Sequence, residues 1–288
     1  MTDKPDGILH DLVLHDLVSA IEKIGIHDHL CLIYETEEEQ FSAVIPYMKI
    51  GLERDEKCLY VVDDNTAAMV IDRMKGAGMD VENAVKSGKL TIASKQDAYL
   101  KQGYFDPDWM IGFLRRATDE AKAAGFSGLR ITGEMTWVLG GDPGTERLME
   151  YEAKLNYFFP KNDALAICQY NRNRFSPVII KDVISTHPIV IYGGLVCSNF
   201  YYVPPDDFLA DEQPAREIDR LLANIVNREK VEEELRKRTR ELERRNHELE
   251  TMNRAFVGRE LKMAELKEKI RKLENQAEKP RNESRHDA

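Results

Sequence analysis

A repeat of apolar residues at intervals of seven marks the last quarter of the 288-residue chain. This spacing places the repeat on one stripe of a long helix, which is buried only when a second helix packs against it. Segment 211–288 contains one glycine and one aromatic residue, so it cannot build a globular core of its own. The pattern predicts a coiled-coil helix over 211–277, most simply a parallel homodimer, and a disordered tail over 278–288. The repeat consists of Leu235, Leu242, Leu249, Phe256, Met263 and Ile270.

The second seam of this repeat changes phase near Gly258. Before this glycine, the residue of the second seam falls four positions after each member of the repeat. Leu266 and Leu273 fall only three positions after Met263 and Ile270, the members of the repeat that precede them. A shift of this kind is a stutter, which changes the local winding of a coiled coil. We expect Gly258 to lie where two registers of the coil are accessible. The alternative is a single solvated helix without a partner.

Residues 1–210 alternate short apolar runs with helical patterns. Continuous apolar strands separated by helices predict a parallel sheet that is covered on both faces, which is an α/β fold. Strands are expected at His29–Tyr34, 58–62, 90–93, 129–132 and 164–170, with a final pair at 189–191 and 195–202. Helices are expected at 37–53, 66–75, 81–86, 108–124, 145–159 and 178–185.

Sheets of this type bind ligands at the carboxyl ends of their strands, so those positions indicate the chemistry. A nucleotide-hydrolysing sheet needs a glycine-rich phosphate loop with Lys and Ser or Thr after its first strand. That position, 35–40, reads ETEEEQ, and its carboxylates would repel a triphosphate. The chain contains no GxxxxGK[ST], GxGxxG or GxSxG motif. We therefore expect a protein that is not an enzyme and that carries no cofactor.

Composition and charge argue against several further classes of protein. The net charge of −10 disfavours a nucleic-acid-binding surface, so no nucleic-acid partner is expected. No apolar run reaches the roughly 20 residues of a membrane helix, and the N-terminus lacks the pattern of a signal peptide. We therefore expect a cytoplasmic protein without a membrane partner. The four cysteines include no CxxC pair, which disfavours a disulfide scaffold or a zinc ribbon.

Aromatic and polar residues gather at the predicted strand ends and within 168–204. Aromatic walls with a few fixed polar groups are typical of small-molecule pockets. The competing interpretation is that the aromatic residues belong to the core and the polar residues form turns. The predicted ligand-binding residues are Tyr34, Glu134, Trp137, Tyr170, His187, Asn199 and Tyr202.

His27, His29 and Cys31 alternate along the first predicted strand, which would place all three on one face. Together with His187 or Cys197 they could hold a metal ion. Cys31, however, lies within an apolar run, which is typical of a core residue. No metal site is therefore predicted. A metal- or redox-responsive role of His29, Cys31 and His187 stays an alternative.

Five segments between residues 20 and 208 carry a resemblance to a known family. They read HDHLCLIYETEEEQ, GLERDEKCLYVVDDN, VKSGKLTIAS, CQYNRNRF and THPIVIYGG…NFYYVPPDDF. In this order they resemble the MEDS domain, the sensory domain of methanogens, methylotrophs and the dichloromethane-responsive regulator. The resemblance implies a RecA-like sheet without its phosphate loop, and a role in sensing small molecules that include hydrocarbon derivatives. The family pattern falls on His29, Cys31, Tyr34, His187, Pro188, Asn199, Tyr202 and Pro204.

The resemblance sets the expected domains: an N-terminal helical segment over 1–19, a MEDS-like sensory domain over 20–210 and the coiled coil. Segment 252–274 resembles the linker helix that often follows sensory domains, commonly just before a kinase. We therefore expect a sensor that binds a small, mostly apolar ligand and relays the signal through a homodimeric coil. Its expected partner is a histidine kinase or another signalling protein. The alternative is a coiled-coil scaffold with a vestigial pocket.

Overall fold

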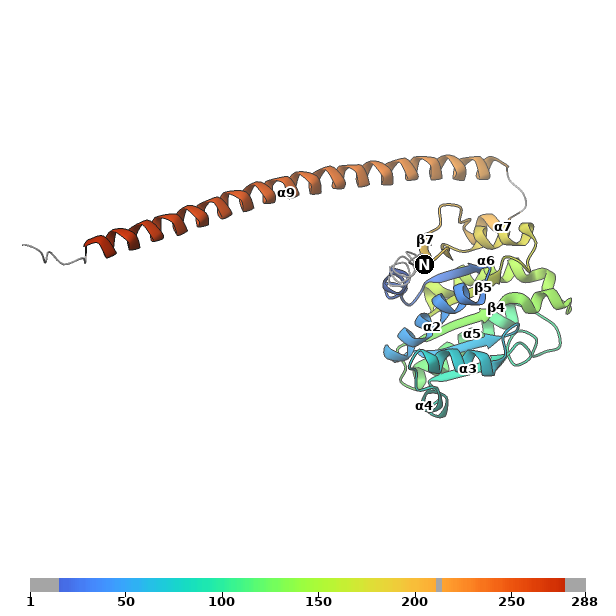
Figure 1. The fold of residues 1–288 in the computed structure, drawn as a ribbon. Helices are drawn as coiled ribbons and strands as arrows, with labels where there is room; N and C mark the ends of the chain where they lie inside the picture. The colour runs from blue at the N-terminus through green and yellow to red at the C-terminus, as the bar shows by residue number, and fades with distance from the viewer. Residues whose placement is uncertain (1–15, 211–213, 278–288) are drawn as a thin grey trace, which may run out of the picture. The chain divides into compact units, whose positions relative to one another are not determined.

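The computed structural model describes residues 16–210 and 214–277 (Figure 1). One sheet contains seven strands: β1 (His29–Tyr34), β2 (Lys57–Val62), β3 (Leu90–Ser94), β4 (Leu129–Glu134), β5 (Ala164–Asn171), β6 (Ile189–Tyr192) and β7 (Leu195–Ser198). Their order across the sheet is β3-β2-β4-β5-β1-β6-β7. Neighbouring strands run parallel except for the antiparallel pair β6 and β7. The predicted α/β class, with a mostly parallel sheet and a long C-terminal helix, is confirmed.

Helices cover both faces of the sheet, as its continuous apolar strands predict. They are α2 (Glu37–Glu53), α3 (Ala67–Gly76), α4 (Val81–Lys86), α5 (Pro107–Ala123), α6 (Leu148–Phe158), α7 (Pro177–Thr186), α8 (Pro205–Phe208) and α9 (Pro214–Ala277). Short 3-10 turns form η1 (Met135–Gly140), η2 (Thr145–Arg147) and η3 (Phe159–Lys161), and residues 16–21 are also helical. One buried cluster includes Leu114 of α5 and Tyr151 of α6, and a second includes Val44 of α2 and Met74 of α3. The core therefore has two layers, with the sheet between them.

The connection from β1 to α2 consists of only Glu35 and Thr36. Thr36 Oγ1 accepts a hydrogen bond from the backbone N–H of Glu39 at 3.2 Å, and the Glu39 carboxylate accepts one from the backbone N–H of Thr36 at 3.4 Å. This capping box starts the helix directly after the strand. A phosphate loop of the GxxxxGK[ST] type needs a longer connection at this place.

The predicted element boundaries agree best where an apolar run or a cap defines them. Both β1 and α2 match the prediction residue for residue. The last strand was predicted to reach residue 202, but β7 ends at Ser198. Beyond it, Asn199 Nδ2 donates to the carbonyl oxygens of Ile184 at 2.6 Å and His187 at 2.7 Å. Such side-chain bonds to the backbone compete with strand pairing and turn the chain away from the sheet.

The chain divides into two compact units between Asp219 and Arg220, and all that is described of the second belongs to α9. α9 is continuous through Gly258, where an added Cβ would meet no atom within 4 Å. The six side chains of the heptad repeat are 51–64% exposed in the single chain. Ion pairs between residues four apart, such as Arg228–Glu232, support the helix. One apolar stripe is thus available to a second helix.

The predicted domain boundaries stay a prediction. Residues 1–15 of the N-terminal segment, 211–213 and the predicted tail at 278–288 lie outside the described residues. Within the described part of the chain, no helix has the length and apolarity needed to cross a membrane.

Candidate functional site

Glu152 belongs to α6, and its carboxylate is completely buried. Leu148 and Leu155, one helical turn away on either side, are also buried, so the helical spacing turns Glu152 inward. An unpaired carboxylate is costly in such a place, and buried charges are therefore paired or bound to metals. The surroundings of Glu152 are for this reason the candidate functional site.

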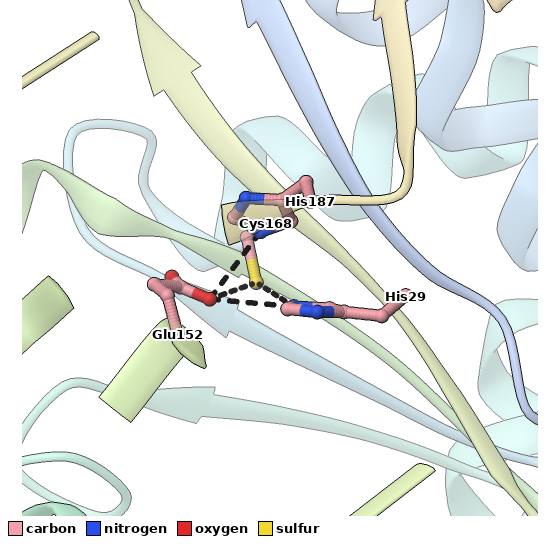
Figure 2. A group of neighbouring side chains, drawn as sticks. All are labelled: His29, Glu152, Cys168 and His187. Carbon is pink, nitrogen blue, oxygen red and sulfur yellow. Dashed lines mark hydrogen bonds and ion pairs between the residues drawn. The ribbon is translucent and has the colours of Figure 1, made fainter. Parts of the chain in front are cut away.

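Three further side chains converge on Glu152 (Figure 2). The Nε2 atoms of His29, from β1, and His187, just after α7, each lie 3.3 Å from Glu152 Oε2. The Sγ atom of Cys168, from β5, lies 3.4 Å from the same oxygen and 3.7 Å from His29 Nε2. We call these four residues the Glu152 cluster. They are at most 5% exposed, so the cluster is closed to solvent.

Hydrogen bonds at the outer ring nitrogens fix both imidazoles. His187 Nδ1 donates to the carbonyl oxygen of Val183 at 2.7 Å, and His29 Nδ1 donates to the side-chain oxygen of Asn156 at 3.1 Å. The amide nitrogen of Asn156 donates to carbonyl oxygens, including that of Thr186 at 2.8 Å, which leaves its oxygen to accept from His29. With hydrogen on Nδ1, each ring directs Nε2 toward Glu152, as an N–H donor when the ring is protonated and as a lone pair when it is neutral.

Burial and charge together set the protonation of the Glu152 cluster. Burial by itself would raise the pKa of Glu152, but the two histidines, His187 foremost, hold that pKa well below its usual range. Burial lowers the pKa of His29, and the neighbouring His187 lowers it further. Burial also raises the pKa of the Cys168 thiol well above its usual value, and the Glu152 carboxylate adds to this shift. The cluster therefore combines an ionised carboxylate with a neutral thiol.

Tyr170 of β5 holds the other oxygen of the carboxylate. Its hydroxyl donates a hydrogen bond to Glu152 Oε1, while Oε2 faces His29 and His187. Two nitrogen atoms, one sulfur and one oxygen thus lie within 4.8 Å of one another. This donor set could hold a transition-metal ion.

A second buried carboxylate, Glu134, joins the carboxyl ends of β2 and β4. Its Oε1 accepts hydrogen bonds from the Tyr60 hydroxyl at 3.0 Å and from Asn65 Nδ2 at 2.9 Å. Its Oε2 accepts from the backbone N–H groups of Asp63 at 3.0 Å and Asn65 at 2.9 Å. Burial raises the pKa of Glu134, although these hydrogen bonds favour the ionised form. Four donors to its two oxygens fasten the loop after β2 to the sheet.

The structure brings some of the seven predicted ligand-binding residues together. His187 belongs to the Glu152 cluster, and Tyr170 donates to Glu152. Tyr34 is buried at the end of β1, where burial and then the charge of Glu134 raise its pKa. Tyr34 and Glu134 thus form a second, separate group at the carboxyl ends of the strands.

The remaining three predicted residues lie elsewhere. Trp137 in η1 stacks on Tyr99, with ring centroids 4.6 Å apart, inside the core. Asn199 forms the turn after β7. Tyr202 follows it and is half-buried, which raises the pKa of its hydroxyl. A common role of all seven residues in ligand binding stays a prediction.

Neither Glu152 nor Cys168 is among the site residues predicted from the sequence. A charged residue between the two inward leucines of α6 was a usable signal for Glu152. Cys168 carried a weaker signal, because a cysteine within an apolar strand usually belongs to the core. Its partner across the β1–β5 pairing is Cys31, which is also buried.

The fold brings together only part of the alternative metal-binding group, His29, Cys31 and His187. His29 and His187 both join the Glu152 cluster, whereas Cys31 is not among its four members. His27 Nδ1 instead donates to the carbonyl oxygen of Phe159 at 2.9 Å, which ties the start of β1 to η3.

An apolar pocket of about 570 Å³ lies beside α2, on the face of the sheet opposite the Glu152 cluster. Phe41 and Ile45 of α2, Leu32 of β1 and the turn between β6 and β7 contribute to its walls. Such a size and lining fit a small, mostly apolar molecule. None of the seven predicted residues lines this pocket, although Tyr34 lies on the same face of β1 as Leu32.

Comparison with known proteins gives a family match and one curated relative. The sequence profile of the family described as "MEthanogen/methylotroph, DcmR Sensory domain" (MEDS) matches residues 28–188. The transcriptional repressor DcmR of Methylorubrum extorquens (strain DSM 6343 / CIP 106787 / DM4) is 26% identical over 189 residues. That match covers 64% of this chain and 66% of the repressor, so the chain spans slightly less than two thirds of its relative.

Two solved structures are similar in fold. A KaiC-like protein from Pyrococcus horikoshii OT3 is 19% identical with a TM-score of 0.41, and covers 57% of this chain and 70% of its own. The flagellar accessory protein FlaH from Methanocaldococcus jannaschii is 14% identical with a TM-score of 0.44, and covers 63% of this chain and 80% of its own. These likenesses concern the fold alone.

Proposed function

This chain belongs to the MEDS family of sensory domains, and from that premise we propose that it is a non-enzymatic sensor of small molecules in signal transduction. The family match and the repressor relative support a signalling or regulatory role. We place the sensor in the cytoplasm. Its net charge of −10 disfavours direct contact with DNA, so its output is proposed to pass to a protein partner.

The proposal that the chain is not an enzyme rests on the connection between β1 and α2. Two residues, Glu35 and Thr36, stand where a nucleotide-hydrolysing sheet has its phosphate loop. A capping box fixes them, and three glutamates follow in the first helical turn. The negative charge and the short connection both disfavour a bound triphosphate.

The apolar pocket beside α2 is the single observation that carries the sensing proposal. Its walls come from a helix, from β1 and from the turn between β6 and β7, so a bound molecule would contact several elements at once. A hydrocarbon derivative, the ligand class that the MEDS resemblance implies, would bury its apolar surface there.

The relay is proposed to run through α9. The heptad stripe is exposed in the single chain, and burying it against a second copy would remove six large apolar side chains from water. A ligand can bias such a coil only through different affinities for two of its states. The proposed recipient is a histidine kinase or another signalling protein.

The test measures the unfolding temperature of the purified full-length protein with added short-chain alcohols and halomethanes. A ligand that binds only the folded state at about 100 times its Kd stabilises that state by about 2.7 kcal/mol. Ser42→Phe, which places a large side chain in the pocket, should abolish the ligand-induced rise in unfolding temperature. Ser42→Ala is the matched control and should retain it.

The outcomes separate the sensor from its main alternative. Loss of the shift in Ser42→Phe alone supports ligand binding in the apolar pocket. Loss in Tyr202→Ala but not in Ser42→Phe would move the site to the predicted residues. A parent protein that responds to none of the compounds would contradict the sensing proposal and favour a coiled-coil scaffold.

A further inference from the structure

We propose that the Glu152 cluster is a transition-metal site for Zn²⁺ or a divalent ion with similar ligand preferences. The ligand atoms are Nε2 of both histidines, Oε2 of Glu152 and Sγ of Cys168 (Figure 2). The site lies on the opposite face of the sheet from the apolar pocket. The metal-site proposal therefore does not depend on the proposed small-molecule role.

Four of the six distances between pairs of ligand atoms fit tetrahedral coordination, and all six lie within 4.8 Å. Zn²⁺ binds histidine nitrogen at about 2.0–2.1 Å, carboxylate oxygen at about 2.0–2.2 Å and cysteine sulfur at about 2.3 Å. Two ligands of a tetrahedron with those bond lengths are about 3.3–3.7 Å apart. The distances from Glu152 Oε2 to the two Nε2 atoms are both 3.3 Å, and Sγ lies 3.4 Å from Oε2 and 3.7 Å from His29 Nε2.

The hydrogen bonds around the cluster prepare its atoms for a cation. Both histidines donate from Nδ1, so their Nε2 atoms and the carboxylate face one another in a dry interior. His187 Nε2 has no hydrogen-bond partner among the described residues, although it lies 3.3 Å from Glu152 Oε2. Outer bonds of this kind orient metal-binding histidines, and the Tyr170 hydroxyl holds the carboxylate in the same way.

The donor set also indicates which metal and which role. Two imidazoles, a thiolate and a carboxylate suit a borderline-soft ion such as Zn²⁺ rather than Mg²⁺ or Ca²⁺. Four protein ligands fill a tetrahedron, which is typical of structural sites, whereas catalytic zinc keeps an open position. Binding would release the Cys168 proton to solvent as the thiolate forms. The ion would join β1, β5, α6 and the segment between α7 and β6.

Cobalt provides a direct spectroscopic test on the full-length chain. The protein is treated with a chelator, titrated with Co²⁺ and then with Zn²⁺, while far-UV circular dichroism monitors the fold. We expect one Co²⁺ per chain, a thiolate-to-cobalt charge-transfer band in the near-UV and the visible bands of tetrahedral cobalt. Zn²⁺ should displace the ion and remove all of these bands.

Substitutions assign the bands to the Glu152 cluster. Cys168→Ser should remove the charge-transfer band, and Glu152→Gln should weaken Co²⁺ binding at least tenfold. Cys197→Ser changes a solvent-exposed cysteine outside the cluster and should leave the spectrum unchanged. A wild-type protein that binds no Co²⁺ would overturn the proposal. A charge-transfer band that persists in folded Cys168→Ser would also overturn it. Since the wild-type spectrum alone can exclude the site, a variant that does not fold leaves the test decisive.

Discussion

At the scale of single residues, Arg130 shows how one buried charge shapes its surroundings. Its side chain is fully buried in β4, forms an ion pair with Glu56 and places its guanidinium 4.4 Å from the ring centroid of Tyr47. Gly51 makes the room, because a Cβ there would lie 2.5 Å from Arg130 Cδ. The two terminal nitrogens of Arg130 lack hydrogen-bond partners among the described residues, so the ion pair with Glu56 offsets most of the cost of burying the charge.

Removing one partner of this pair should cost more than removing both. Glu56→Gln leaves the guanidinium charge buried and unpaired, and should lower the free energy of unfolding by about 3–5 kcal/mol. Arg130→Met should cost less, because a carboxyl group left alone can take up a proton whereas a guanidinium cannot release one. Urea unfolding at pH 7 measures these changes. The double variant should recover much of the loss, and losses that simply add would contradict this account.

The site was partly predictable at the same scale. His29 and His187 could be singled out from the sequence because histidines beside apolar strands are uncommon enough to examine. Glu152 could not be joined to them, because its role depends on how α6 lies across β5. The same holds for Tyr170, which was predicted as a pocket residue but donates to Glu152 inside the core.

At the scale of elements, the sequence predicts an element well where local chemistry decides its ends. The capping box of Thr36 and Glu39 starts α2, and an apolar run defines β1. The end of β7 depends instead on Asn199, whose side chain reaches the backbone of another segment. Such a long-range bond leaves no pattern in the local sequence, so the predicted strand was too long.

Gly258 allows a prediction about α9. Glycine within a helix costs about 1 kcal/mol relative to alanine, and an added Cβ would meet no neighbour in the single chain. Gly258→Ala should therefore stabilise α9 by about 1 kcal/mol and alter the signal output. Thermal unfolding followed by far-UV circular dichroism measures the stability. Ala264→Gly, the reverse change nearby, should destabilise the helix by a similar amount, and an unchanged output with unchanged stability in Gly258→Ala would refute the role of this position.

At the scale of the whole molecule, strand order is what assembles the candidate site. β1 lies between β5 and β6, which sets His29 beside Cys168 and close to the segment that carries His187. Alternation of strands and helices predicts a parallel sheet but does not specify this order. The fold class was therefore predictable from the sequence, whereas the meeting of four distant side chains was not.

The proposed relay also depends on the assembly of whole chains, because a single copy leaves the heptad stripe of α9 in water. Native mass spectrometry of the full-length protein at micromolar concentration tests this step, with Leu242→Glu as a variant that places a charge in the stripe. We predict the mass of two 33.1 kDa chains for the parent protein and of one chain for the variant. A parent protein that is monomeric over the whole concentration range would contradict a sensor that signals through a dimeric coil.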